Sequence, residues 1–134
     1  FREFDSHTTT MNVIKVINKV YPEIAKDYSC NAKVEMYKSI FTRLNVIPAT
    51  TEDSACAEYD WSKNKIYIYT NNMNNEEDII KALIHECVHS NQNKELFNAY
   101  YLIGLDYNTN PCEIEAEYEE KNWIKYKLNT ITNG

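Results

Sequence analysis

The sequence predicts an α+β domain in which helices at both ends of the chain enclose a small β-sheet or hairpin. Apolar residues recur at helical spacing near the N-terminus and again beyond residue 76, whereas residues 56–70 are rich in aromatic and β-branched side chains. The chain has 134 residues, enough for one hydrophobic core but too few for two ordinary ones. We therefore expect residues 1–134 to form a single domain.

Two N-terminal packing helices are expected. After three threonines that can cap a helix, Val13 and Ile17 begin an apolar stripe that we expect to end at Pro22. A second helix is expected from about Asn31, with an apolar stripe that continues until shortly before Pro48. Each predicted helix would bury its apolar face against the rest of the domain.

The middle of the chain predicts a β-hairpin. The segments CAEYDW, residues 56–61, and KIYIYT, residues 65–70, are short and contain the residue types that favour strands. The polar segment SKN lies between them and can form the turn. The two segments are therefore expected to pair.

The C-terminal half predicts helices. An asparagine-rich loop ends in a pattern that resembles a capping box, so a helix is expected to begin near Glu76. Helical spacing then continues to about Gly104. Asn110 and Pro111 are typical of an N-cap and a first helical position, and the last helix is expected to run to about Leu128.

Charge and composition restrict the partners. A formal net charge of −6, without a cluster of lysine or arginine, opposes binding to nucleic acid. No apolar run is long enough to span a bilayer, and no signal-peptide pattern opens the chain. The four cysteines form no CxxC pair, which favours free thiols in a reducing compartment. We expect an intracellular, cytoplasmic monomer that binds neither nucleic acid nor membrane.

The segment HECVH, residues 85–89, has the chemistry of a metal site. His85 and His89 lie about 40° apart around a helix axis, so both imidazoles can reach one ion. Glu86 lies about 100° from His85, where it can reach a water molecule at the metal more easily than the metal itself. Catalytic zinc has three protein ligands. Because His7 is the only other histidine and lies in a polar N-terminal stretch, a carboxylate or a cysteine is expected to complete the site.

HECVH resembles the HExxH motif of the zincin metallopeptidases, and the resemblance covers residues 56–120. It implies a zincin-like fold, in which residues 65–70 are similar to the edge strand that borders the cleft. Such a strand could align an extended peptide substrate through main-chain hydrogen bonds. The resemblance also implies Zn²⁺ as cofactor and Glu86 as general base in peptide-bond hydrolysis.

The third ligand separates two groups of zincins. Metzincins would use Glu95, but Gln92 stands where they have the glycine of a sharp turn. The segment EAEYE instead resembles small gluzincins, in which a glutamate on a later helix is followed by alanine and, four residues on, by an acid. This resemblance implies Glu115 as third zinc ligand and Glu119 as the partner of a histidine ring.

Other residues could serve as the third zinc ligand in place of Glu115. Glu113 is the closest rival because it also has an acid four residues on, and Cys112 and Glu95 are weaker ones. The usual transition-state histidine of gluzincins has no counterpart here, since no histidine follows residue 89. Tyr107, on the loop before the last helix, is the candidate to stabilise the oxyanion in its place.

The sequence therefore predicts a zinc-dependent endopeptidase that acts on a peptide or protein substrate. The alternative is a catalytically silent, zinc-stabilised binding or regulatory domain. Glu86 favours the enzyme, because a structural zinc site has no use for a general base at that position. A metal-independent interaction domain would require the histidine pair to be accidental.

Overall fold

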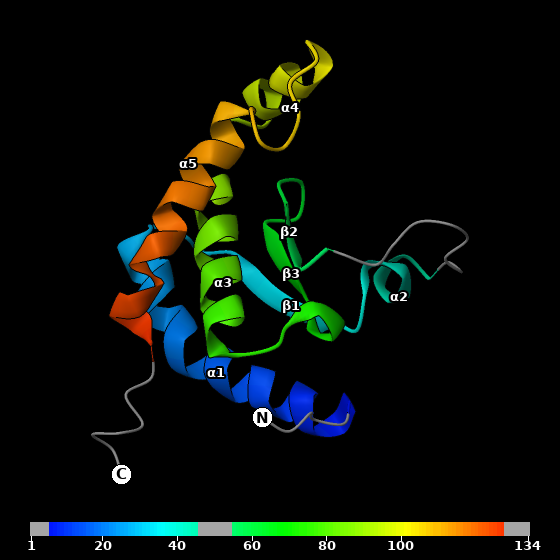
Figure 1. Ribbon diagram of the computed structural model, residues 1–134, viewed down its shortest axis with the longest axis vertical. Helices are drawn as coiled ribbons and strands as arrows, with labels where there is room; N and C mark the ends of the chain where they lie inside the picture. Colours follow the sequence, from blue (N-terminus) through cyan, green and yellow to red (C-terminus); the bar gives the residue numbers. More distant parts are fainter. Residues whose placement is uncertain (1–5, 46–54, 128–134) are drawn as a thin grey trace.

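A three-stranded mixed sheet and five α-helices make up the described part of the computed structural model, residues 6–45 and 55–127. The α+β class predicted from the sequence is therefore confirmed for these residues. The sheet lies on one side of helix α3, and helix α5 runs along the other side (Figure 1). Among the described helices, none combines the length and the apolar character that a membrane span requires.

Helices, strands and 3₁₀ segments, the last labelled η, follow one another along the described chain. Their bounds are α1, Ser6–Asp27; β1, Lys33–Tyr37; α2, Ile40–Leu44; β2, Ala57–Asp60; β3, Lys65–Tyr69; η1, Thr70–Asn72; α3, Glu76–Ser90; α4, Lys94–Leu102; α5, Pro111–Glu119; and η2, Glu120–Tyr126. The expected last helix thus changes to 3₁₀ geometry at Glu120.

Strand β3 is the central strand of the sheet, whose order is β1-β3-β2. It pairs antiparallel with β2, which confirms the predicted hairpin, and parallel with β1. In the hairpin turn, Asp60 Oδ1 accepts hydrogen bonds from the backbone N–H groups of Ser62 and Lys63, and Asn64 adopts a φ of 54°. The prediction that residues 65–70 form an edge strand was wrong, because β1 pairs with their second side. The edge strands are β1 and β2, and β2 is the one that lines the cleft described below.

The prediction of a second N-terminal packing helix was also wrong. Its first part is strand β1, in which Val34 and Met36 pack against the core, and only α2 is helical. Ser39 starts α2, since its Oγ accepts a hydrogen bond from the Thr42 N–H at 3.1 Å. The apolar spacing in this segment is compatible with either period, and pairing with β3 favoured the strand.

Helix α1 is the N-terminal packing helix, and it lies against α3. It continues through Pro22 to Asp27, beyond the expected end. Ile24, which is fully buried, extends the apolar stripe by another turn past the proline. Burial of that turn outweighs the lost backbone hydrogen bond. The stripe that packs on the core comprises Val13, Ile17, Val20 and Ile24.

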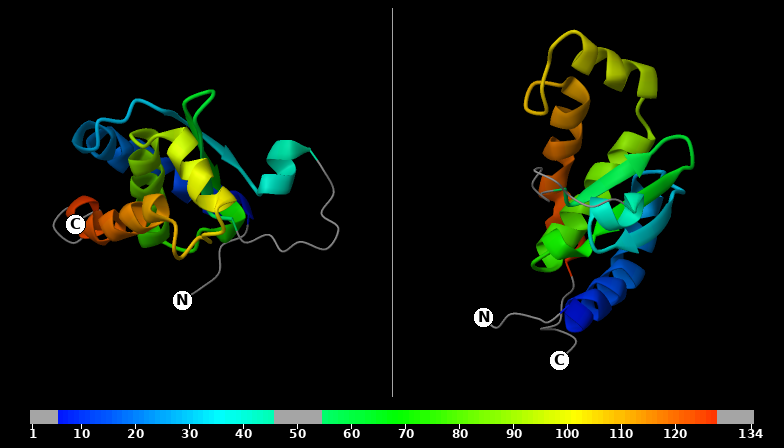
Figure 2. Two further views of the ribbon diagram at one scale, coloured as in Figure 1. Left: turned by 90° about the horizontal axis from the view of Figure 1, so that it is seen from above. Right: turned by 90° about the vertical axis from the view of Figure 1, so that its right-hand side faces the viewer.

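Helix α3 is the central helix and begins at Glu76 as expected, with Asn75 Oδ1 accepting from the Asp78 N–H at 2.9 Å. Contrary to expectation, helical structure does not continue unbroken to Gly104. Asn93 starts a separate helix, α4, because its side chain accepts from the Leu96 N–H at 2.8 Å. Gly104, at a φ of 104°, follows the end of α4. Figure 2 shows α4 at one end of the molecule, between the ends of α3 and α5.

Candidate metal centre

Helix α3 carries the two histidines in a buried position. The exposed fractions of His85, Glu86 and His89 are 6%, 6% and 4%. The helix is enclosed because α1, the sheet and α5 all pack against it. Trp61 and Phe97 cover the His89 ring, with centroid distances of 5.9 and 5.1 Å. The imidazoles therefore face the protein interior at the side of a cleft, rather than open solvent.

Helix α5 supplies an acidic group to the same place. Its start is set by Asn110, a fully buried N-cap whose side chain accepts from the Cys112 N–H at 2.9 Å. The following turn buries Cys112, Glu113 and Ala116. Ala116 is completely buried, and its small side chain allows α5 to approach α3 closely. As a result, Glu113 is directed toward the histidines.

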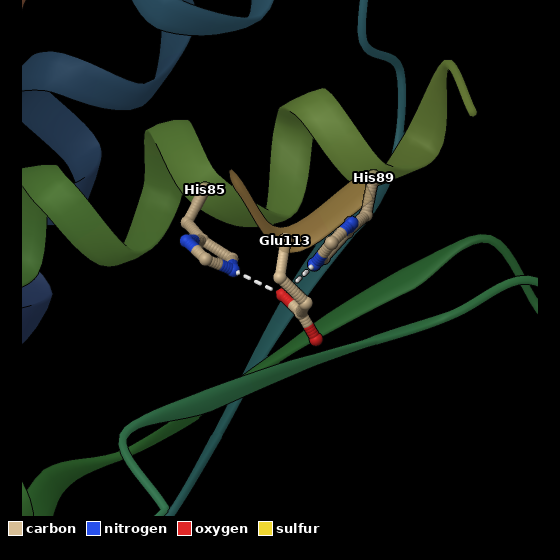
Figure 3. A group of neighbouring side chains, drawn as sticks. All are labelled: His85, His89 and Glu113. Atoms are coloured by element: carbon tan, nitrogen blue, oxygen red, sulfur yellow. Dashed lines mark hydrogen bonds and ion pairs between the residues drawn. The ribbon is translucent and has the colours of Figure 1, made fainter. Parts of the chain in front are cut away.

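The three side chains converge on one point (Figure 3). Glu113 Oε1 lies 2.9 Å from Nε2 of His85 and 2.9 Å from Nε2 of His89. One ligand atom from each residue lies within 4.8 Å of the other two. This buried group could therefore bind a metal ion.

The Nδ1 atom of each histidine ring lies within hydrogen-bond distance of an acceptor. His85 Nδ1 lies 2.6 Å from Glu120 Oε2, and His89 Nδ1 lies 2.6 Å from Gln92 Oε1. The Gln92 amide nitrogen donates to the backbone oxygen of Cys112, so its Oε1 is the acceptor. Both Nδ1 atoms must therefore carry protons, and neutral rings direct their Nε2 lone pairs at the Glu113 carboxylate. Two Nε2 lone pairs and a carboxylate oxygen then face one another, and these three acceptors require a cation between them, either a proton or a metal ion.

The electrostatics of the site agree with this need. Burial would lower the pKa of His85, but hydrogen bonds to Glu113 and Glu120 outweigh it and raise the pKa to about 10. Burial would raise the pKa of Glu113, yet its hydrogen bonds with the two histidines lower it to about 2. The site therefore stabilises positive charge at the point where the three side chains meet.

The donor set fits zinc. Two imidazole nitrogens and one carboxylate oxygen are ligands that zinc accepts, and three protein ligands leave a position open. The acceptors on Nδ1 would keep each Nε2 available for the ion and hold each ring in orientation. Gln92 is local to His89, whereas Glu113 on α5 and Glu120 on the adjoining η2 are distant in the chain, so tertiary structure brings these two carboxylates to the histidines.

Glu86 lies beside the ligand group and lines the same cleft, whose volume is about 830 Å³. Burial raises the pKa of the Glu86 carboxyl to about 7, against the opposing effect of the two histidines. The cleft is bordered by His85, His89 and Glu113 on one side and by residues of the β2 strand on the other. A carboxyl with a pKa near neutrality in such a cleft can accept and release protons.

The structure brings Glu113, and not the predicted Glu115, to the two histidines. Glu115 is exposed and accepts a hydrogen bond from Gln92 Nε2 at 2.7 Å, whereas Glu113 contacts both histidines. The two glutamates lie about 200° apart around the helix axis, so only one of them can face α3. The burial of Ala116 turns the Glu113 side inward.

The predicted partner of a histidine ring is corrected as well. Glu119 accepts from the Tyr28 hydroxyl at 3.0 Å, while Glu120 holds His85. Glu113 and Glu120 are seven residues apart, which is close to two helical turns and was the available signal. Glu95 is exposed and is not part of the described ligand group.

Two tyrosines lie next to the ligand group. Tyr107, the predicted oxyanion stabiliser, lines the cleft, and its ring stacks on His85 at a centroid distance of 6.2 Å. Tyr101 was not predicted, and its hydroxyl donates to Glu113 Oε2 at 2.9 Å. Burial raises the pKa of Tyr101 to about 12, so its hydroxyl remains a donor at neutral pH. No local sequence pattern distinguishes Tyr101 from its neighbour Tyr100.

Comparisons of the chain with protein-family models, with curated proteins and with solved structures found no match. The features that bear on function are therefore the geometry of the cleft and the side chains that line it. These features are a buried His-His-Glu group, an adjacent carboxyl and an edge strand along the opposite wall.

Proposed function

We propose that the protein is a zinc-dependent endopeptidase of the zincin type, with His85, His89 and Glu113 as zinc ligands. The observation that carries the proposal is the convergence of two Nε2 atoms and one carboxylate oxygen beside a buried carboxyl, Glu86, on the wall of a cleft. A structural zinc site would require the ligands but would have no use for Glu86.

The order of elements supports the resemblance to zincins. An edge strand, β2, lines the cleft, the HExxH helix α3 follows it in the chain, and a later helix, α5, supplies the acidic ligand. The main chain of β2 could align an extended peptide by adding it to the edge of the sheet. This role, expected for residues 65–70, is transferred to Ala57–Asp60.

The chain's own residues can supply the proton transfers of peptide hydrolysis. A bound zinc ion would polarise the scissile carbonyl and increase the acidity of a nearby water molecule. Glu86 would accept the proton of that water molecule and then pass it to the leaving amine. Its raised pKa, about 7, suits both steps at neutral pH. The Tyr107 hydroxyl would donate to the carbonyl oxygen as negative charge develops there.

The test combines zinc analysis with a peptide-library cleavage assay. Protein purified without added metal should contain one zinc per chain and should cleave a subset of the library. The Glu86→Gln variant should retain zinc, because Glu86 is not a ligand, and should lose about 100-fold or more in turnover. The Glu117→Gln variant is the matched control, since it removes an exposed carboxylate on α5 and should leave both properties unchanged.

Each outcome has a distinct meaning. Absence of zinc, both as purified and after titration, would contradict the proposed metal site. Zinc binding without cleavage of any peptide would favour a silent, zinc-stabilised binding domain. Equal cleavage by the wild type and by Glu86→Gln would exclude Glu86 as the general base.

A further inference from the structure

The two oxygens of the Glu113 carboxylate have different partners. Oε1 lies between the two histidine Nε2 atoms, whereas Oε2 accepts a hydrogen bond from the Tyr101 hydroxyl at 2.9 Å. A carboxylate can bind a metal ion through one oxygen or through both. A hydrogen bond to Oε2 favours binding through Oε1 alone.

We propose that Tyr101 is a positioning residue, which holds Glu113 so that one carboxylate oxygen faces the histidines and the other is withheld from the metal. The inference rests on the proposed metal site. Tyr101 contacts the ligand from α4, so the helix between the two ligand-bearing helices takes part in the site without supplying a ligand.

Helix α4 is held in the place that this role requires. The Tyr101 ring contacts the Phe97 ring edge to face, with centroids 5.3 Å apart, and Phe97 in turn packs against Trp61 at 4.9 Å. The Phe97 backbone oxygen accepts from the side chain of Asn110, the N-cap of α5. The phenol and the helix that bears Glu113 are thus fixed to a common frame.

Tyr101 and Tyr107 have separate positions. Tyr107 lines the cleft and stacks on His85, where a substrate could meet its hydroxyl. Tyr101 instead reaches the far oxygen of Glu113. Loss of the Tyr101 hydroxyl should therefore change the metal site directly, through the orientation of its carboxylate.

The first measurement is zinc affinity by competition with a chromophoric chelator. Tyr101→Phe removes only the hydroxyl, and its zinc Kd should rise by about 10-fold or more, as is typical when the partner of a metal ligand is lost. Tyr100→Phe is the matched control, because it removes the same group from the neighbouring half-buried residue of α4. Its zinc Kd should remain within about twofold of the wild-type value.

The second measurement reports the coordination itself. Cobalt(II) replaces zinc in many sites, and its visible spectrum depends on the number and geometry of its ligands. The spectrum of the cobalt-loaded Tyr101→Phe variant should differ from that of the wild type, because Oε2 becomes able to bind. The Tyr100→Phe spectrum should match the wild type.

A double-mutant cycle separates positioning from an effect on folding. In the Glu113→Ala background, Tyr101→Phe should cause no further loss of zinc affinity, because the carboxylate that it holds has been removed. An equal loss in both backgrounds, or an unchanged zinc Kd and cobalt spectrum in Tyr101→Phe, would overturn the inference while leaving the metal site intact. Failure of the wild type to bind zinc or cobalt would instead contradict the proposed function.

Discussion

Glu113 and Glu115 provide the sharpest test of the ligand assignment. Both are glutamates on α5, two residues apart, but only Glu113 contacts His85 and His89. Replacing each by alanine makes the same chemical change in the same helix. Glu113→Ala should weaken zinc binding strongly, and Glu115→Ala should leave it nearly unchanged.

The expected magnitude follows from the number of ligands. Four-ligand structural sites bind zinc with about 10–16 kcal/mol, which is roughly 3 kcal/mol for each ligand. At about 1.4 kcal/mol for each factor of ten, the loss of one ligand should raise the zinc Kd roughly 100-fold. Glu115→Ala removes one acceptor from Gln92, which keeps its 3.0 Å hydrogen bond to the Cys112 oxygen and its contact with His89. A change of less than about threefold is expected there.

The assay is a chelator competition titration of wild type and both variants at one pH, with circular dichroism to verify that each variant is folded. A Kd that rises strongly for Glu115→Ala and stays constant for Glu113→Ala would refute the assignment. Equal losses in the two variants would show that the effect comes from α5 as a whole and not from a ligand.

Four other predictions concern the surroundings of the ligands. Gln92→Leu removes the acceptor at His89 Nδ1 and should weaken zinc binding by about 10-fold or more in the same titration. Because the pKa of His85 is raised to about 10, zinc binding at pH 7.5 should release about one proton, seen as a binding enthalpy that varies with the ionisation enthalpy of the buffer. With zinc chelated, the folded state binds a proton at Glu86 more tightly than the unfolded state, so the free energy of unfolding of the wild type, relative to that of Glu86→Gln, should fall as pH rises from about 5 to about 7; denaturant titrations in which this difference rises would contradict the prediction. Tyr107→Phe should lower kcat about 10-fold or more while leaving zinc affinity unchanged, and an unaltered kcat would exclude Tyr107 as the oxyanion donor.

The sequence by itself determined the features that depend on local geometry. The spacing of His85 and His89 places two imidazoles on one side of any helix, so the pair was evident before the structure was known. The capping pattern at Asn75 located the start of α3, and the polar turn before Lys65 located the hairpin. In each case, residues within a few positions of one another specify the outcome.

Only the tertiary structure decided which distant groups meet. Residues 33–37 are a strand because β3 is available as a partner, and that pairing makes β3 the central strand of the sheet. Glu113 and not Glu115 reaches the histidines because the close approach of Ala116 to α3 determines which side of α5 faces inward. Sequence spacing on α5 is compatible with either side, since a helix carries residues all around its axis. The side that is buried depends on the surface of another helix, more than twenty positions away in the chain.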